Sequence, residues 1–501
     1  MTASEIILAG ERQNARPWPR HTLTQAAWRE MAAALADEPT LALLALWADS
    51  AAIYALFLDE TSGAILPVST ALDDGAYPAL SPTRPVAAWM ERMVHDLWAR
   101  TATGGTDARP WLDHGRWGVI APLSPRPTPF NTNPDPPDFL PAEGEDLHQI
   151  AVGPVHAGII EPGHFRFHAA GETIVRLEAR LGYTHKGTLS LMRGKSPRAA
   201  IRFAARLSGD ATVAHSIAFA RAAEAAVDSP APPRAAALRA VMAELERLAN
   251  HLGDVGAICN DASFGFALAR FCLHREAMLA AAAAAFGHRL MMDCVIPGGV
   301  AADITQPGPD AILRALDALE AELPGLLRVY DDTTSLVDRM AGTGTLTSAM
   351  ASLFAAGGPV GRASGRPFDA RRIPGYPPYD DLDVAVPVLR AGDVDARVRI
   401  RLLEITESIR LLRALLINLP ESPIVATQPM ATGEGIGVAE TCRGDAWHWM
   451  RLDGGLIAAC FMRDPSWALW PALEAAVEGN IVADFPLANR SFNASYSGVD
   501  L

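Results

Sequence analysis

The stretch RAAALRAVMAELERLANHLGDVG, residues 234–256, decides the fold of this chain. Apolar side chains recur in it three and four positions apart, at Leu238, Val241, Leu245, Leu248 and Leu252. This spacing predicts a helix with one apolar face, while Glu244, Arg247 and His251 fall along another face. The same period predicts further helices from about residue 196 onward, at 267–289, 309–328, 395–419 and 466–478.

The residues before this helical region mix helix and strand signals. Helical periods cover 23–36 and 86–100, and 53–68 predicts two strands around a turn at residues 61–63. Residues 148–183 are punctuated by Gly and Pro and predict a small antiparallel sheet. The glycine-rich segment 433–440 is far from any strand-to-helix phosphate loop, which favours a β-hairpin over a nucleotide site.

A proline-rich segment divides the chain. Residues 121–142 contain eight prolines, which fix φ and remove backbone donors, so an extended connector without regular pairing is expected. We therefore expect an N-terminal α/β domain at 1–121, a linker at 122–142 and a larger, mainly helical domain with peripheral antiparallel sheets at 143–501. The predicted fold class is α+β.

Composition and charge exclude several classes of protein. Lys plus Arg number 43 and Asp plus Glu 57, so the net charge of −14 argues against a nucleic-acid partner. The first residues lack a secretory signal, and no run of about 18 uncharged apolar residues occurs, so we expect a cytoplasmic protein. The five scattered cysteines form no CxxC pair for zinc or an iron–sulfur cluster.

Five polar and aromatic-rich clusters interrupt the apolar helices, at 153–164, 181–188, 206–216, 361–383 and 484–501. Polar groups in such a core need partners or a shared cavity. Each cluster could also be an independent turn or helix cap.

Several short motifs within and between these clusters follow one order. They are ERMVHDLW (91–98), GPVH (153–156), YTHKG (183–187), AELERLANHL (243–252), RASGRPFDARR (362–372) and VEGNIVADFPL (477–487). In order and spacing they resemble the large subunit of membrane-bound, energy-converting nickel–iron hydrogenases, with the formate hydrogenlyase large subunit most similar in layout. They also resemble the fused 30-kDa and 49-kDa subunits of complex I. The resemblance implies a 30-kDa-like domain at 1–121 and a hydrogenase large-subunit or 49-kDa-like domain at 143–501.

The chain departs from the active hydrogenases at their metal ligands. Those members hold nickel and iron through two CxxC pairs, and the matching positions here are Ser208, Ala211, Ser495 and Gly498. A serine hydroxyl stays protonated near neutral pH, and alanine and glycine carry no ligand atom, so we expect no such cluster. Leu189, four residues after His185, also replaces a family carboxylate, and leucine cannot relay a proton.

The complex I relatives use the same cavity for a quinone headgroup. His156 matches the region of the hairpin histidines of that site, but Gly209 takes the place of its tyrosine, so Tyr376, Tyr379 or Tyr496 would have to substitute. The cavity or quinone-binding candidates are His156, His185, Ser208, Ala211, His215, Arg362, Asp369, Tyr376, Ser495 and Gly498. For His156 and His185 a purely structural hydrogen-bonding role stays open. We expect 153–164, 181–188, 206–216 and 484–501 to converge on one hydrated pocket lined by Ser208, Ser495 and His156.

Three functions remain open from the sequence. The first is a non-hydrogenase subunit of a membrane-attached redox complex, on the inner face of the cell membrane, in electron transfer coupled to ion translocation. The resemblance implies as partners an iron–sulfur small subunit, a ferredoxin-like subunit and antiporter-like membrane subunits, together with quinone binding and NAD binding in the complex. No cofactor is assigned to this chain itself, quinone being the candidate, and iron–sulfur clusters are expected on partner subunits. The second function is an inert structural scaffold, and the third a free-standing metal enzyme with His, Asp and Glu ligands.

Overall fold

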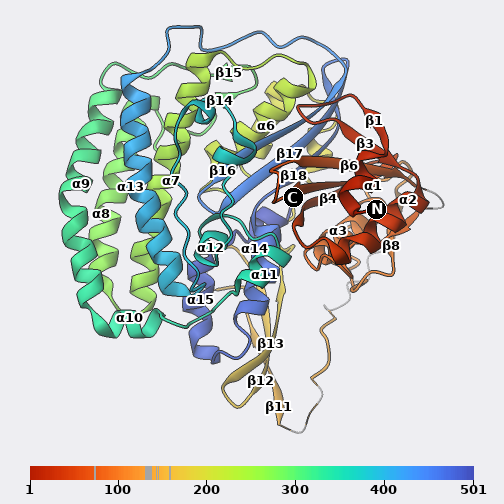
Figure 1. The fold of residues 1–501 in the computed structure, drawn as a ribbon, viewed down its shortest axis with the longest axis horizontal. Coiled ribbons are helices and arrows are strands. Elements are labelled where there is room, and N and C mark those ends of the chain that lie inside the picture. The colour runs from red at the N-terminus through yellow and green to blue at the C-terminus, as the bar shows by residue number, and fades with distance from the viewer. Residues whose placement is uncertain (73–74, 130–137, 143, 145, 157–159) are drawn as a thin grey trace.

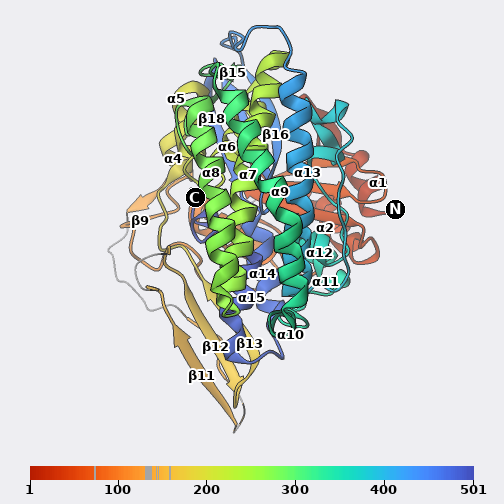
Figure 2. The ribbon, with the colours of Figure 1, turned by 90° about the vertical axis from the view of Figure 1, so that its left-hand side faces the viewer.

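The structure, a computed structural model, describes residues 1–501 except 73–74, 130–137, 143, 145 and 157–159. Long helices form one side of the molecule and the N-terminal sheet the other, with the C-terminal sheet between them (Figure 1). A three-stranded sheet projects from the lower end, as the turned view also shows (Figure 2). The architecture is α+β, as the sequence predicts.

A five-stranded sheet and three helices build the N-terminal part. The strands, in the order β1-β3-β6-β5-β4, are β1 (Glu11–Gln13), β3 (Arg20–Leu23), β6 (Ile65–Ala71), β5 (Ala52–Asp59) and β4 (Leu41–Ala48). The remaining elements are α1 (Ala3–Leu8), α2 (Gln25–Ala34), α3 (Ala87–Trp98) and the parallel pair β7 (Ala76–Pro78) and β8 (Thr101–Thr103). The predicted helices at 23–36 and 86–100 and the strands around residues 61–63 are confirmed. The prediction omits β4, whose uninterrupted apolar run is buried along its whole length.

The N-terminal part packs directly on the C-terminal sheet. That sheet has the order β18-β17-β16-β2, with β16 (Gly433–Thr441), β17 (Gly444–Asp453), β18 (Leu456–Arg463) and β2 (Ala15–Arg16). The antiparallel pairing of β16 with β17 confirms the predicted hairpin. Trp47 of β4 lies 5.4 Å from Phe461 and 5.7 Å from Trp449, measured between ring centroids. Because β2 comes from the first sixteen residues, the sheets cross the division at residue 121, and that division stays a prediction.

The proline-rich segment is less extended than predicted. Thr128–Pro129 forms strand β10, which pairs with β9 (Val119–Ile120). Leu123 is buried, and its N–H donates to the Leu97 carbonyl at 2.9 Å. The first third of the predicted linker therefore packs on α3, because apolar residues between the prolines, such as Leu123, are buried against it. Residues 130–137 of the linker lie outside the described residues.

The second half contains the projecting sheet and most of the helices. The sheet is antiparallel, as predicted, and consists of β11 (Leu147–Val152), β12 (His164–Ala170) and β13 (Thr173–Arg180). A further two-stranded pair is β14 (Val295–Ile296) and β15 (Gly299–Val300). The helices are α4 (Thr188–Met192), α5 (Pro197–Ala204), α6 (Thr212–Ala226), α7 (Pro233–Asp261), α8 (Gly265–Phe286), α9 (Gly308–Asp332), α10 (Thr334–Met340), α11 (Ser348–Leu353), α12 (Gly358–Ala363), α13 (Val394–Ile417), α14 (Ser466–Ala476) and α15 (Phe485–Phe492). The helices predicted at 267–289, 309–328, 395–419 and 466–478 are confirmed.

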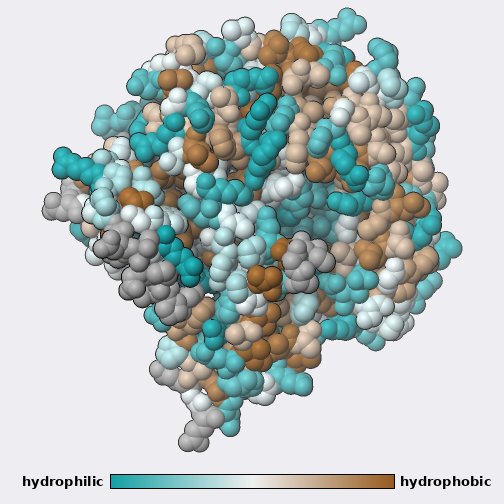
Figure 3. Space-filling view, turned by 180° about the vertical axis from the view of Figure 1, so that it is seen from behind, coloured by the Kyte–Doolittle hydropathy of each residue, from teal (hydrophilic) through white to brown (hydrophobic). Residues whose placement is uncertain are grey.

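The helix quoted first, α7, is buried on its polar face as well as its apolar one. Glu244, Arg247 and His251 are all 0–1% exposed. Among the helices of the described ranges, none combines the length and the low charge needed to cross a membrane. On the face opposite to that of Figure 1, hydrophobic side chains lie in patches among hydrophilic ones (Figure 3).

Helix α6 lies against strand β16 at backbone distance. A methyl group on any of three alternate glycines of β16 would overlap a carbonyl oxygen of the helix, with Gly433 meeting Ala226, Gly435 meeting Ala222 and Gly437 meeting Ala218. Glycine is therefore required at these positions so that the helix can approach the strand. This contact fixes the position of α6, whose first turn follows Ser208.

Candidate functional site

Ser208 and Ser495 meet in the interior of the second half. Ser208 lies in the turn before α6 and Ser495 follows α15, and their Oγ atoms are 3.0 Å apart. Both residues are buried, and the Ser495 Oγ also accepts the N–H of Gly498 at 3.0 Å. The expected approach of segments 206–216 and 484–501 is therefore confirmed.

The space beside these serines is filled by a carboxylate. A methyl group built on Gly498 would lie 2.6 Å from Cγ of Asp464, so any side chain at position 498 would require Asp464 to move. Ala211 is buried next to Ser208, and its N–H donates to the Ser208 carbonyl at 3.1 Å. The four positions therefore present hydroxyls, a methyl group and a neighbouring carboxylate, which are not the soft sulfur donors that a nickel–iron centre needs.

Asp464 begins a buried chain of hydrogen bonds that includes the predicted residue His215. The Asp464 Oδ2 lies 2.8 Å from Nε2 of His215 on α6, and His215 Nδ1 lies 3.0 Å from Nε2 of His448 on β17. Burial would raise the pKa of Asp464, but the His215 hydrogen bond and the Arg443 charge lower it to about 2. Burial and the neighbouring His215 lower the pKa of His448 well below its ordinary value, so this ring is neutral.

An ion pair between Asp210 and Arg443, which was not predicted from the sequence, lies beside Ser208. Arg443 donates through Nη1 to Asp210 at 2.7 Å, and through its other two nitrogens to Asp210 and to the Asn493 carbonyl. Ser208 also donates to Asp210, at 3.2 Å. Burial would raise the pKa of Asp210, but the Arg443 charge lowers it, so the carboxylate is ionised. Asp210 keeps 42% of its side chain exposed, and it connects the otherwise buried centre to the surface.

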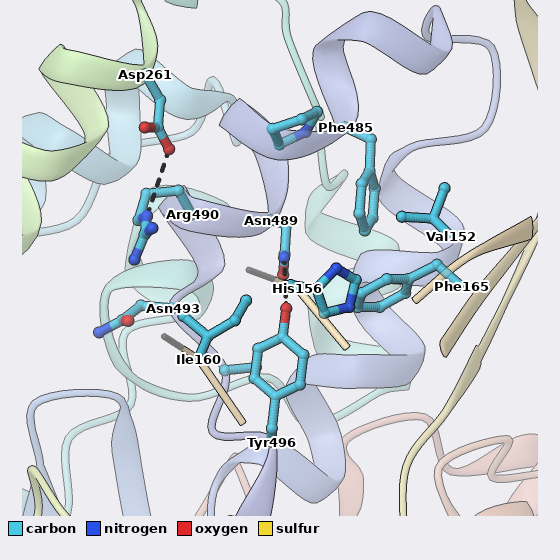
Figure 4. Close-up of a pocket in the computed structure, with 12 residues that line it drawn as sticks. Val152, His156, Ile160, Phe165, Asp261, Phe485, Asn489, Arg490, Asn493 and Tyr496 are labelled. Carbon is cyan, nitrogen blue, oxygen red and sulfur yellow. Dashed lines mark hydrogen bonds and ion pairs between the residues drawn. The ribbon is translucent and has the colours of Figure 1, made fainter. Parts of the chain in front are cut away.

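His156 lines a pocket next to this centre rather than the centre itself (Figure 4). The pocket has a volume of about 230 Å³ and lies between the projecting sheet and α15. The His156 Nε2 lies 2.6 Å from the Gly163 carbonyl oxygen, which makes Nε2–H the donor and leaves Nδ1 as an acceptor. The Tyr496 hydroxyl accepts from Asn489 at 3.1 Å, so its own proton is free to donate. Burial raises the pKa of Tyr496, which keeps that proton in place.

The single hydrated pocket expected from the sequence stays a prediction, and the pocket of Figure 4 is lined by His156 and not by Ser208 or Ser495. Ser208 and Ser495 are buried in the hydrogen-bonded centre. Ser497 joins this centre to segment 153–164, because its N–H donates to Glu161 at 2.8 Å and its Oγ donates to the Leu207 carbonyl at 3.0 Å.

His185 lies at a third place, against the C-terminus. Its Nδ1 is 2.5 Å from the backbone oxygen of Asp500, and its ring stacks on Trp117 at 4.7 Å between centroids. Burial lowers the pKa of His185. Together with Leu189 it borders a cavity of about 350 Å³ between α3 and α4. The ring thus ties the N-terminal part to the last residues of the chain.

Arg362, Asp369 and Tyr376 belong to a buried network on the polar face of α7. Arg362 donates to Glu404 at 2.7 Å and to Glu440 at 3.0 Å, and it pairs with Asp369 at 3.3 Å. The Tyr376 hydroxyl accepts the Glu440 N–H at 3.1 Å. Burial raises the pKa of Glu440 to about 7 against the opposing effect of Arg362. No hydrogen bond between described residues links these side chains directly to Ser208 or Ser495.

The same network receives the polar residues of α7. Glu244 accepts from Arg371 at 3.0 Å and from Tyr379 at 2.6 Å, and His251 Nε2 lies 2.7 Å from Glu404. Tyr376 and Tyr379 are therefore committed to internal contacts, and of the three substitute tyrosines only Tyr496 reaches the His156 pocket. Within the described ranges, no group of three or more His, Cys, Asp or Glu side chains is arranged to hold a metal ion.

Comparisons with known proteins give the family. The family of the respiratory-chain NADH dehydrogenase 49-kDa subunit matches residues 266–432. The carbon monoxide-induced hydrogenase of Rhodospirillum rubrum is 30% identical over 354 residues, covering 70% of this chain and 98% of that protein. The chain belongs to this 49-kDa subunit family. Formate hydrogenlyase subunit 5 of Escherichia coli (strain K12), another relative, is 29% identical over 464 residues, covering 90% of this chain and 82% of that protein.

The fold of the 49-kDa family is also seen in a solved structure. The membrane-bound sulfane sulfur reductase, an archaeal respiratory membrane complex, contains a chain with a TM-score of 0.67 at 24% identity, covering 71% of this chain and 99% of that one. These findings confirm the resemblance to hydrogenase and complex I subunits. The residues of the family match, 266–432, include neither Ser208 nor Ser495. The correspondence of residues 208, 211, 495 and 498 to the cysteine ligands therefore stays a prediction from the sequence.

Proposed function

We propose that the chain belongs to a membrane-attached redox complex, where it takes part in electron transfer coupled to ion translocation without hydrogen chemistry. Its relatives, which include both hydrogenase and NADH-quinone oxidoreductase subunits, support its place in a membrane-attached redox complex. They include formate hydrogenlyase subunit 5, hydrogenase-4 component G and a component of an NADH-quinone oxidoreductase. The absence of hydrogen chemistry rests on the direct contact of Ser208 with Ser495.

That contact argues against a nickel–iron centre because of its chemistry. Low-spin iron and nickel bridged by sulfur need deprotonated thiolates, whereas both serine hydroxyls are protonated and hydrogen-bonded. The Asp464 carboxylate stands beside Gly498 where a fourth ligand would have to enter. A hydrogenase reaction at this place would require the replacement of several residues at once.

The His156 pocket is our candidate site for an electron acceptor, and a quinone headgroup suits it. Tyr496 offers a hydroxyl donor at one side, and the ring of His156 lies 6.5 Å away between centroids. Phe165 and Phe485 supply apolar walls for a ring. The volume of about 230 Å³ lies below the range of about 300–1,000 Å³ for drug-sized ligands, which favours a headgroup over a whole quinone.

The partners follow from the same proposal. An iron–sulfur small subunit and a ferredoxin-like subunit would carry the clusters, and antiporter-like membrane subunits would hold the chain at the inner face of the cell membrane. A structural scaffold is the second candidate function, and the burial of Ser208 and Ser495 in direct contact with each other favours it.

Purification of the native complex through a tag on this chain tests the proposal. We expect copurified quinone, no stoichiometric nickel, and reduction of a water-soluble quinone that falls at least tenfold in Tyr496→Phe. The exposed Tyr183 provides the control Tyr183→Phe, which should keep full activity. Unchanged quinone reduction in Tyr496→Phe would reject the pocket. A complex with partners but no quinone and no redox activity would establish the scaffold instead.

A further inference from the structure

Arg221 is a half-buried arginine that differs from several arginines around it. Arg239, Arg362 and Arg371 each donate to at least one carboxylate. Arg221, on α6, makes no hydrogen bond or ion pair with any residue in the described part of the chain, and its Nε is buried without a partner. Arg221 is half-buried, and only its Nε is among the buried unpaired atoms, so its terminal nitrogens can accept a group from outside the described residues.

The guanidinium of Arg221 borders a small cavity between α6, α7 and the segment around Tyr376. The cavity has a volume of about 60 Å³. Arg221 lies over the Tyr376 ring, 4.7 Å from its centroid, which orients the guanidinium plane. Helix α6 contacts α7 on one side, and strand β16 packs against α6.

Neither carboxylate near this cavity serves as the partner of Arg221. Glu224 is occupied by Arg239, which donates to both of its oxygens at 2.6 and 3.1 Å, and it also accepts the Gly298 N–H at 2.8 Å. Asp380 is exposed, and among the ion pairs of the described residues it has none with Arg221, although its charge opposes the effect of burial on the pKa of Arg221. Burial lowers the pKa of Arg221, against the opposing charge of Glu224, which is the expected effect for a desolvated cation that lacks a direct partner.

We propose that this cavity binds one small oxyanion, a phosphate or a carboxylate group. Arg221 would supply a bidentate guanidinium contact, the geometry that favours arginine over lysine for such groups. One water needs about 10–15 Å³ on the same scale, so about 60 Å³ holds a few waters or a single oxyanion and excludes a nucleotide. The oxyanion is either free in solution or the side-chain carboxylate of a partner chain. This inference is independent of the electron-transfer proposal.

Titration of the purified full-length chain with inorganic phosphate tests the free source. At constant ionic strength, held with chloride, phosphate should raise the unfolding midpoint of the wild type. In Arg221→Gln the apparent affinity should fall at least tenfold, while Arg221→Lys, which keeps the charge, should retain part of the effect. The exposed Arg198 on α5 gives the matched control Arg198→Gln, which should behave as the wild type.

Carbodiimide coupling of the Arg221→Lys variant in the assembled complex tests the partner source. An isopeptide bond from position 221 to an Asp or Glu of another subunit, found by mass spectrometry, would identify a partner carboxylate. A bond to Asp380 of the same chain would overturn the proposal, because Arg221 would then have an internal partner. The absence of both a phosphate effect and a cross-link to another chain would overturn it as well.

Discussion

Replacement of Asp464 by asparagine removes the charge at the start of the buried Asp464–His215–His448 chain. The ordinary carboxyl pKa of 3.8 is lowered to about 2 in the folded chain, where the His215 hydrogen bond and Arg443 outweigh the effect of burial. At about 1.4 kcal/mol for each tenfold change in proton affinity, this corresponds to about 2 kcal/mol of folding free energy at pH 7. Asp464 is 0% exposed, so solvent screening does not reduce this value.

The sign of the pH dependence follows from the lowered pKa. The folded chain keeps Asp464 ionised to a lower pH than the unfolded chain does. The stabilisation is therefore complete at neutral pH, falls as the pH drops below about 4, and is lost below about 2. Asp464→Asn should accordingly lower the free energy of unfolding by about 2 kcal/mol at pH 7 and by only about 1 kcal/mol at pH 3.

Urea unfolding followed by tryptophan fluorescence at the two pH values measures both differences. Asp331→Asn is the matched control, because the Asp331 side chain is 54% exposed and its ion pair among the described residues is with Arg399 at the surface. We expect that control to change stability by less than about 0.5 kcal/mol at either pH. A loss at pH 7 in Asp464→Asn no greater than that of the control would refute the reasoning, as would a loss that is the same at pH 3.

Three further predictions use other parts of the chain. Elemental analysis of protein made in a host with complete nickel-maturation machinery should find no nickel, and about one nickel per chain or hydrogen uptake with a dye acceptor would contradict this. Limited proteolysis should cut first between 122 and 142, where prolines prevent extended pairing, and a first cut within 200–350 would contradict the domain division. Gly437→Ala should lower the free energy of unfolding by more than about 2 kcal/mol, because the new methyl group overlaps the Ala218 carbonyl. Gly325→Ala, in α9 with open space around it, should instead be neutral or stabilising in the same urea experiment.

The elements that could be predicted from the sequence are those whose signal is local. The long helices at 234–256 and 395–419 follow from apolar residues at helical spacing, and the projecting sheet follows from its Gly and Pro punctuation. Strand β4 could not be identified in the same way. Its apolar run is buried on both faces, so it shows neither the alternation of a half-buried strand nor the period of a helix.

The arrangement of the candidate site depends on contacts between distant residues. Asp210 and Arg443 are 233 positions apart in the sequence. Asp210 lies in the polar cluster 206–216, and Arg443 follows shortly after the glycine-rich segment 433–440. Their opposite charges became informative only when the fold placed them together. The lining of the His156 pocket had no local signal either, because it combines side chains from distant segments of the chain.

The bare backbone contact between α6 and β16 has a mechanical consequence. At these glycines the helix backbone rests directly on the strand, with no side chain between them whose rotamer could change to absorb a displacement. His215 on α6 and His448 on β17 are thus carried by a single rigid block, whose two halves are also joined by their hydrogen bond. If a neighbouring subunit displaced the C-terminal sheet, α6 would therefore move with the sheet. The turn at Ser208, which precedes α6, would be displaced as well.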